Sequence, residues 1–296
     1  CRSIYRNEVH FMFIAAQLIN GISASALLLI YSLGVVVIMG HMNVVNMAHG
    51  ECIMLGAYVC YYINTVAGAP FFVALIMSFV VTALFGLLIE RLVIRKLYGK
   101  TAETLLATYA LSLIVKQLIN LICGSELKYI AIPFEGHFDI GGVTIPYYNI
   151  FIILFAAAIL LITWLIFYKT PFGTKMRAVT SNRPMTECLG INAHAVDSLT
   201  FAFGVGLAGL AGAVLAPIRG VSPFMGASYI TDSFINVCVG GLQSMIGTTL
   251  SSLLIGESTS ILGGFWNEVD AKILVFLIVV VLIRFRPDGL FRKEKR

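Results

Sequence analysis

Five residues with side chains capable of chemistry lie close together between two apolar runs near the start of the chain. They are His41, Asn43, Asn46, His49 and Glu51. An unpaired polar group in hydrocarbon is costly, so such residues must face a cavity, water or one another. The spacing lacks the i, i+4 histidine pair of a zinc helix. The cluster therefore indicates either a polar turn that caps two helices or the lining of a path for a polar solute.

A second apolar stretch, 240–257, is broken by glycines in the same way as the stretch 40–58. Short, glycine-interrupted apolar segments in corresponding positions of two halves are typical of a transporter site near the bilayer midplane. The two stretches therefore suggest an inverted internal repeat. They also suggest a solute path lined by Asn43, Asn46, His49, Glu51, Asn236 and Gln243. A helix rich in glycine and alanine around 204–213 is expected to pack closely against its neighbours.

Lys116 is a charge within an apolar run, and an intramembrane charge is a hypothesis for a functional site by default. We interpret Lys116 as reaching to the outer interface with its long side chain.

The basic loop 169–194 contains a second group of interest. It is expected to open with a Pro-Phe-Gly turn and to continue as a short amphipathic helix that carries Met185, Cys188 and Leu189 on one side. Gly190 is the expected C-cap of that helix. Such a helix could dock a soluble partner or lie at the membrane surface without one.

The composition indicates the kind of fold that must position these residues. The chain is 59% apolar and 12% charged, whereas soluble domains carry about 25% charged residues. We therefore expect an all-α, polytopic membrane protein that forms one domain over 1–296. Its apolar runs predict eight or nine spans, some of them short or broken.

Charge distribution gives the orientation. Basic residues gather at 91–100, at 169–183 and in the C-terminal tail, a distribution that the positive-inside rule places in the cytoplasm. The more acidic gaps 124–147 and 265–270 are then outside. The net charge of +5 is thus explained by membrane orientation, and we expect no nucleic-acid partner.

Enzyme motifs are missing from the sequence. It contains no Walker A pattern, nucleophile elbow or HExxH, so we expect no catalytic residues. The six cysteines show no CxxC spacing, which favours free thiols over metal or redox work. We therefore expect no metal and no cofactor.

Several motifs together resemble the permease of the branched-chain amino acid and urea importers, a branch of the ATP-binding-cassette (ABC) superfamily. They are Asn43-Val-Val-Asn46-Met-Ala-His49-Gly50-Glu51, Glu90-Arg91, Cys188-Leu-Gly-Ile-Asn192 and Arg286-Pro-Asp-Gly-Leu-Phe291. The stretches 177–183 and 229–234 look closer to the urea-type permease.

This resemblance implies a transport subunit in the bacterial inner membrane that moves urea or short amides by alternating access. It implies two cytoplasmic ATPase subunits, a second homologous permease subunit and a periplasmic solute-binding protein as partners. The loop would then be the ATPase-coupling segment, with Arg183, Met185, Glu187, Cys188, Leu189, Gly190, Ile191 and Asn192 as its contact residues. The alternatives are an importer of branched-chain amino acids and an ATP-independent channel or facilitator.

Overall fold

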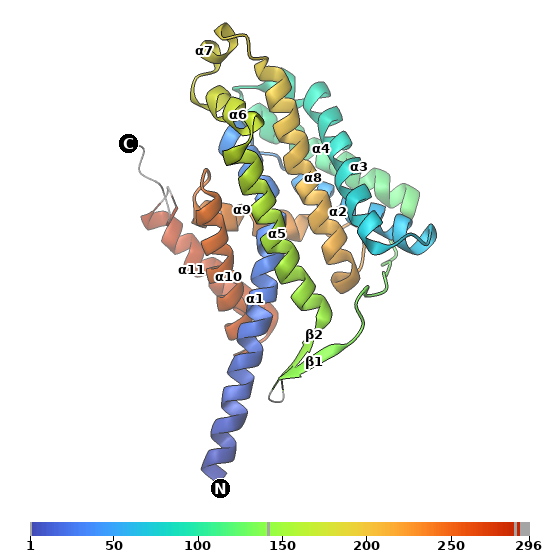
Figure 1. The fold of residues 1–296 in the computed structure, drawn as a ribbon, viewed down its shortest axis with the longest axis vertical. Coiled ribbons are helices and arrows are strands. Elements are labelled where there is room, and N and C mark those ends of the chain that lie inside the picture. Colours follow the sequence, from blue (N-terminus) through green and yellow to red (C-terminus); the bar gives the residue numbers. More distant parts are fainter. Residues whose placement is uncertain (1, 141–142, 287–288, 291–296) are drawn as a thin grey trace. The chain divides into compact units, whose positions relative to one another are not determined.

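A computed structural model describes residues 2–140, 143–286 and 289–290, and most of them are helical (Figure 1). The helices are α1 (Arg2–Met42), α2 (His49–Tyr61), α3 (Phe71–Leu92), α4 (Thr101–Cys123), α5 (Tyr147–Lys169), α6 (Pro171–Ser181), α7 (Arg183–Cys188), α8 (Ala193–Arg219), α9 (Gly226–Gly240), α10 (Met245–Phe265) and α11 (Glu268–Phe285). A π-helical turn (Tyr62–Val66) continues α2, and a 3₁₀ turn (Ile94–Leu97) follows α3. Part of the motif at 286–291 lies outside the described residues.

A short hairpin departs from the all-α expectation. Strands β1 (His137–Ile140) and β2 (Val143–Pro146) pair antiparallel, with His137 opposite Pro146. The hairpin lies in the gap between α4 and α5, which the charge pattern predicts to be outside the membrane.

Among the described residues, five helices are long and apolar enough to cross a membrane. They are α1 from Ala16 to Met42, α3, α4, α5 and α8. Helices α9 and α10, with a bend of 117° between them, add a sixth if the pair counts as one span. The prediction of a helical, multi-pass membrane protein is therefore confirmed.

The predicted number of eight or nine spans is not reached in the described residues. Helix α2 has only 13 residues, which extend about 20 Å at 1.5 Å per residue, against roughly 30 Å of hydrocarbon. Helix α11 has charged residues near both of its ends, which shorten its apolar stretch. A run can be apolar because it is buried in protein as well as because it faces lipid, so composition alone overcounts spans. The inverted repeat stays a prediction.

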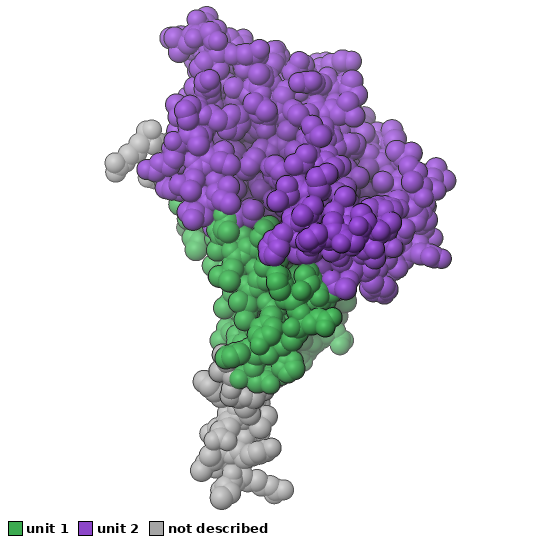
Figure 2. All heavy atoms as spheres, turned by 45° about the vertical axis from the view of Figure 1, so that its right-hand side comes forward, with its two compact units in different colours: residues 1–29, 132–158, 235–296 green, residues 30–131, 159–234 purple. Residues whose placement is uncertain are grey.

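The chain divides into two compact units, which Figure 2 shows in different colours. Unit 1 comprises residues 1–29, 132–158 and 235–296, and unit 2 comprises residues 30–131 and 159–234. The organisation as one domain over 1–296 stays a prediction.

In unit 2, helix α8 packs against both α2 and α3. Its glycines bring the backbones together, because a Cβ on Gly209 would collide with Thr82 and one on Gly212 would collide with the Ile53 backbone. Gly56 of α2 likewise leaves no room for a side chain against Gly209. The predicted close packing of the glycine-rich helix is confirmed, and it holds α2 in place.

In unit 1, helix α10 packs against α11 and against the part of α1 that belongs to this unit. Gly256 leaves room for Ser25 of α1. At the bend before α10, Gly241 adopts a φ of 97°, which glycine tolerates because it has no Cβ. The Ser244 hydroxyl then accepts a hydrogen bond from the Gly247 N–H at 2.9 Å and caps α10.

Candidate functional site

The break between α1 and α2 is held by side chains. Asn43 adopts a φ of 52°, a left-handed conformation that asparagine tolerates better than most residues. The Asn46 side-chain oxygen accepts a hydrogen bond from the Ala48 N–H at 3.0 Å. The Met47 N–H donates to the Thr108 hydroxyl of α4 at 3.1 Å. The start of α2 is therefore fixed by the break itself and by α4.

Asn46 and His49 are buried together at this point, with 3% and 1% of their surface exposed. The His49 Nε2–H donates to the Tyr31 carbonyl at 3.2 Å. His49 Nδ1 and Asn46 Nδ2 have no hydrogen-bond partner among the described residues. Both residues border a narrow gap that is too small for a water molecule and whose other walls are apolar side chains, mainly from α1. Two buried polar atoms thus lack a hydrogen-bond partner in the described part of the chain.

Glu51 lies in the first turn of α2 and its side chain is 3% exposed. The Ser112 hydroxyl of α4 donates to its Oε1 at 3.1 Å. The Lys116 ammonium, also on α4, is 3.7 Å from the same oxygen. The other carboxylate oxygen, Oε2, has no hydrogen-bond partner within the described part of the chain. Glu51 is therefore a buried carboxylate that is only half satisfied.

The Lys116 ammonium pairs with Glu51, a contact that the sequence interpretation did not foresee, and its reach to the outer interface stays a prediction. The signal that could have identified this pair is a polar row at i, i+4 spacing along the apolar helix α4. The row consists of Thr104, Thr108, Ser112 and Lys116. Such spacing places side chains on one face of a helix, and Thr108 and Ser112 of this row contact the start of α2.

The structure brings together only some of the predicted path residues. Asn46, His49 and Glu51 are buried side by side at the start of α2, and Asn43 is exposed at the break. Asn236 and Gln243 belong to unit 1. There Asn236 is buried and its carbonyl accepts a hydrogen bond from the Ser251 hydroxyl at 3.0 Å, whereas Gln243 is exposed.

The loop between α5 and α8 forms the short helices α6 and α7. The Pro-Phe-Gly segment is the first turn of α6 and not a separate turn, because proline at the first helical position costs no hydrogen bond. The Asn182 side chain caps α7 through the Met185 N–H at 3.1 Å. After α7, Gly190 adopts a φ of 80°, so its predicted capping role is confirmed.

The predicted coupling residues divide into an exposed group and an anchored one. Met185 is 59% exposed and Leu189 is 71% exposed, and Glu187, Cys188 and Gly190 are exposed beside them. The Asn192 side chain caps α8 by accepting from the Ala195 N–H at 3.0 Å. Ile191 is half-buried. The loop therefore presents an apolar tip on a capped, well-defined backbone.

Arg183 points back toward the protein. One of its nitrogens lies 2.8 Å from Asp197 of α8, and another lies 3.2 Å from Glu187. Its guanidinium also stacks over the Tyr98 ring at 5.3 Å. Arg183 thus ties the loop to the start of α8.

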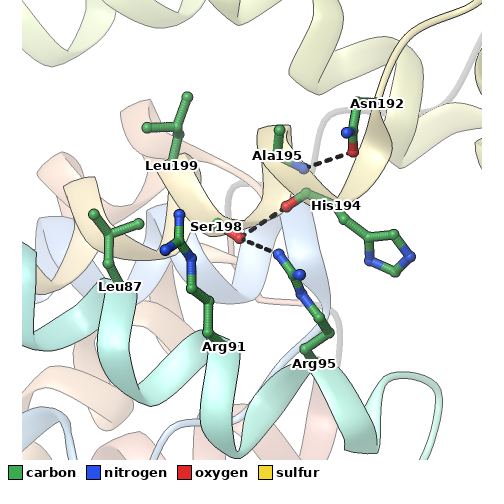
Figure 3. A pocket seen from close by; sticks show the side chains of 8 residues that line it. All are labelled: Leu87, Arg91, Arg95, Asn192, His194, Ala195, Ser198 and Leu199. Carbon is green, nitrogen blue, oxygen red and sulfur yellow. Dashed lines mark hydrogen bonds between the residues drawn. The ribbon is translucent and has the colours of Figure 1, made fainter.

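A second buried carboxylate, Glu90 of α3, lies at the N-terminal end of α8, where Arg183 also binds. It is fully buried, and the Ser198 hydroxyl donates to its Oε2 at 2.5 Å. The Tyr98 hydroxyl donates to its Oε1 at 3.2 Å, and Arg95 is 3.6 Å from that oxygen. Burial and the nearby carboxylates of Asp197 and Glu90 raise the pKa of Tyr98 well above its ordinary value, so its hydroxyl stays a donor. Figure 3 shows Arg95 reaching Ser198.

The two basic gaps therefore meet at one place in unit 2. Arg95 follows α3 and Arg183 lies in the loop before α8, and both pair with groups on or next to the first turns of α8. This agrees with their prediction to one side of the membrane. In the part of the chain that the structure describes, no three His, Cys, Asp or Glu side chains gather as a metal site requires.

Comparisons with known proteins cover nearly the whole chain. Residues 17–283 match the family described as the permease component of the branched-chain amino acid transport system. The high-affinity branched-chain amino acid transport permease BraD of Pseudomonas aeruginosa is 27% identical over 94% of this chain and 96% of its own length. The corresponding permease LivH of Escherichia coli K12 is 24% identical over 96% and 97%. The probable LivH of Methanocaldococcus jannaschii is 27% identical over 92% of each chain. No solved structure matches.

These relatives are named for branched-chain amino acids, and nothing in the matches supports the closer likeness to the urea-type permease that the motifs suggested. The relatives are transport permeases rather than enzymes. The family match spans 267 consecutive positions, 17 through 283, which is most of the chain. The chain belongs to the family of branched-chain amino acid transport permease components, within the ABC-type importers.

Proposed function

We propose that this chain is the membrane-spanning permease subunit of an ATP-driven importer for branched-chain amino acids. The observation that carries the proposal is the pairing of the buried Glu51 with the half-buried Lys116 in a chain of this family. A branched-chain amino acid is a zwitterion with an apolar side chain. A path for it needs one partner for an ammonium and one for a carboxylate. Glu51 and Lys116 supply one of each, 3.7 Å apart.

Urea is the second candidate solute. It is neutral, so a path for it needs amide and hydroxyl groups and no fixed charge pair. The Asn46 amide and the Ser112 hydroxyl would serve either solute, whereas Glu51 and Lys116 favour the zwitterion. The names of the relatives point in the same direction.

The geometry of the pair suits an exchange of partners. Its separation of 3.7 Å is longer than the roughly 2.7–2.9 Å of a charge-assisted hydrogen bond. Glu51 Oε2 also has capacity for a further donor in the described residues. In the proposed exchange, the ammonium of the solute reaches Glu51 while its carboxylate reaches Lys116. Each of the two charges is then paired before and after the solute passes, which avoids the cost of a lone charge in the membrane.

Helices α6 and α7 are the proposed contact with two cytoplasmic ATPase subunits. Met185 and Leu189 offer an exposed apolar tip. Arg183 would pass its movement to α8 through Asp197, and the Glu90 network would pass it on to α3. A second homologous permease subunit and a periplasmic solute-binding protein complete the proposed complex in the bacterial inner membrane. The proposed lining of the solute path is unchanged and consists of Asn43, Asn46, His49, Glu51, Asn236 and Gln243.

Uptake by the assembled complex in proteoliposomes tests the proposal. Labelled leucine and labelled urea are supplied with the binding protein, and with ATP or a non-hydrolysable analogue inside the vesicles. We expect uptake of leucine that requires ATP hydrolysis. Urea uptake without leucine uptake would show that the solute is urea. Leucine flux without ATP would show that the protein is a facilitator and not an ATP-driven importer.

The coupling segment has its own test. The double variant with Leu189→Asp and Ile191→Asp should abolish association of the ATPase subunits while the permease still inserts, because it puts charge on the apolar tip. Asn120→Asp on α4, away from the loop, is a control that should retain association. Co-purification measures both, and retained association in the double variant would remove the coupling role.

A further inference from the structure

A pocket of about 520 Å³ opens between the C-terminal end of α3 and the N-terminal end of α8. Figure 3 shows Leu87 and Leu199 at one end of it and His194 at the other, with Arg91 and Arg95 between them. The volume is within the range of ligand sites, about 300–1,000 Å³. The pocket thus combines an apolar end with a strongly basic one.

The two arginines differ in how far they are already engaged. Arg95 donates to the Ser198 hydroxyl at 3.0 Å and lies 3.6 Å from the buried Glu90 carboxylate. Arg91 is exposed and has neither a hydrogen bond nor an ion pair with any residue that the structure describes. His194 lies 3.3 Å from Arg183, whose charge is balanced by Asp197. Arg91 is therefore the cation that is available to a ligand.

The place of the pocket indicates the kind of ligand. It lies where the two basic gaps of the chain meet, at the end that the positive-inside rule assigns to the cytoplasm. The neighbouring side chains Leu88, Leu92 and Leu199 are between 53% and 58% exposed. On a membrane protein such exposed leucines face hydrocarbon. The pocket is therefore at the boundary between acyl chains and headgroups, next to a leaflet that carries anionic lipids.

We propose that this pocket binds the phosphate group of an anionic phospholipid. Arg91 is the main contact, since its guanidinium can donate two parallel hydrogen bonds to phosphate oxygens. Arg95 and His194 flank the phosphate. Leu87 and Leu199 contact the beginning of the acyl chains. Such basic pockets between helices at the cytoplasmic face suit anionic headgroups. The site is separate from the solute path and does not depend on the transported solute.

The test is a titration of the purified full-length chain with phosphatidylglycerol, followed by native mass spectrometry. Phosphatidylcholine and inorganic phosphate are titrated in parallel. The variants are Arg91→Gln and, as a matched control, Lys96→Gln, because Lys96 is an exposed cation of the same segment outside the pocket. Ala195→Phe is a second variant, which fills the pocket without a change of charge.

We expect Arg91→Gln to weaken phosphatidylglycerol binding about tenfold, since a hydrogen bond to a charged group is lost. Ala195→Phe should weaken it similarly, and Lys96→Gln less than about twofold. If Arg91→Gln fails to fold, the effect of Ala195→Phe on phosphatidylglycerol binding tests the proposal by itself.

Three results would overturn the proposal. Equal losses in Arg91→Gln and Lys96→Gln would indicate only general surface charge. Binding of inorganic phosphate that depends on Arg91, with no preference for the lipid, would indicate a soluble anion. The third result has two parts: the complex with the ATPases no longer binds phosphatidylglycerol, and Arg91→Gln weakens ATPase association. Together they would show that the pocket binds an acidic side chain of the ATPase.

Discussion

Two buried glutamates of unit 2 differ in how completely they are satisfied. Glu90 has partners on both carboxylate oxygens, namely the Tyr98 and Ser198 hydroxyls and the Arg95 guanidinium. Glu51 has Ser112 and Lys116 on one oxygen, and its other oxygen has no hydrogen-bond partner among the described residues. Both side chains are nearly or fully withdrawn from solvent.

This difference suggests that Glu90 stabilises the fold and that Glu51 is suited to bind a passing solute. A fully satisfied buried carboxylate stabilises the fold, because each of its donors would lose a partner without it. A half-satisfied one has capacity that the fold does not use. Glu90 also lies where α3, the segment after α3 and the start of α8 meet, whereas Glu51 lies in the first turn of α2 against α4. We therefore expect substitutions of the two residues to affect different properties.

The largest expected effect on stability is that of Glu90→Ala. It leaves the donors of Ser198 and Tyr98 without their acceptor in a buried place and should lower the free energy of unfolding by about 3 kcal/mol. Denaturant unfolding in detergent micelles measures this. Glu103→Ala is the matched control, because the Lys100–Glu103 pair is exposed and should cost less than about 0.5 kcal/mol. Similar losses in both variants would contradict the structural role of Glu90.

Glu51→Gln should show the opposite pattern. The Ser112 hydroxyl can still donate to the amide oxygen, and Lys116 is 22% exposed, so the loss of stability should stay below about 1 kcal/mol. Leucine uptake should fall about a hundredfold, since the ammonium of the solute loses its charged partner. Uptake per folded complex, at a fixed rate of ATP hydrolysis, is the measurement. Full uptake with a large loss of stability would assign Glu51 to the fold.

Lys116 tests the other half of the pair. Lys116→Met should lower leucine uptake about tenfold, because it removes the partner of the carboxylate and leaves Glu51 without a nearby cation. Lys116→Arg keeps the charge and should restore most of the activity. If the arginine variant is as inactive as the methionine variant, the role of Lys116 lies in its shape and not in its charge.

The smallest expected effect concerns the frame that holds Glu51. Thr108→Val removes the acceptor of the Met47 N–H and should cost about 1 kcal/mol of unfolding free energy, with a change in uptake below about threefold. Thr231→Val, which removes an exposed hydroxyl that bonds only within α9, should be nearly neutral. A Thr108→Val variant as stable as Thr231→Val would show that α4 does not hold the break.

Parts of both the fold and the site could be predicted from local pattern. The glycine-rich helix and the Gly190 cap depend on neighbouring residues, and the structure forms both. Of the polar cluster at 41–51, the structure buries Asn46, His49 and Glu51 together and leaves Asn43 exposed. The span count could not be predicted, because α2 is apolar through burial in protein although its 13 residues are short for a bilayer. The motifs suggested the urea-type permease, whereas the relatives that match are named for branched-chain amino acids.

The sequence by itself indicated that this chain spans a membrane and that it resembles the permeases of this importer family. Those properties depend on composition and on short motifs, which a linear chain displays directly. Only the tertiary structure decided which charges meet. Glu51 and Lys116 are 65 positions apart, as 116 minus 51, and lie on different helices. Their pairing follows from the packing of α2 against α4, because a buried charge takes the partner that the fold brings within reach.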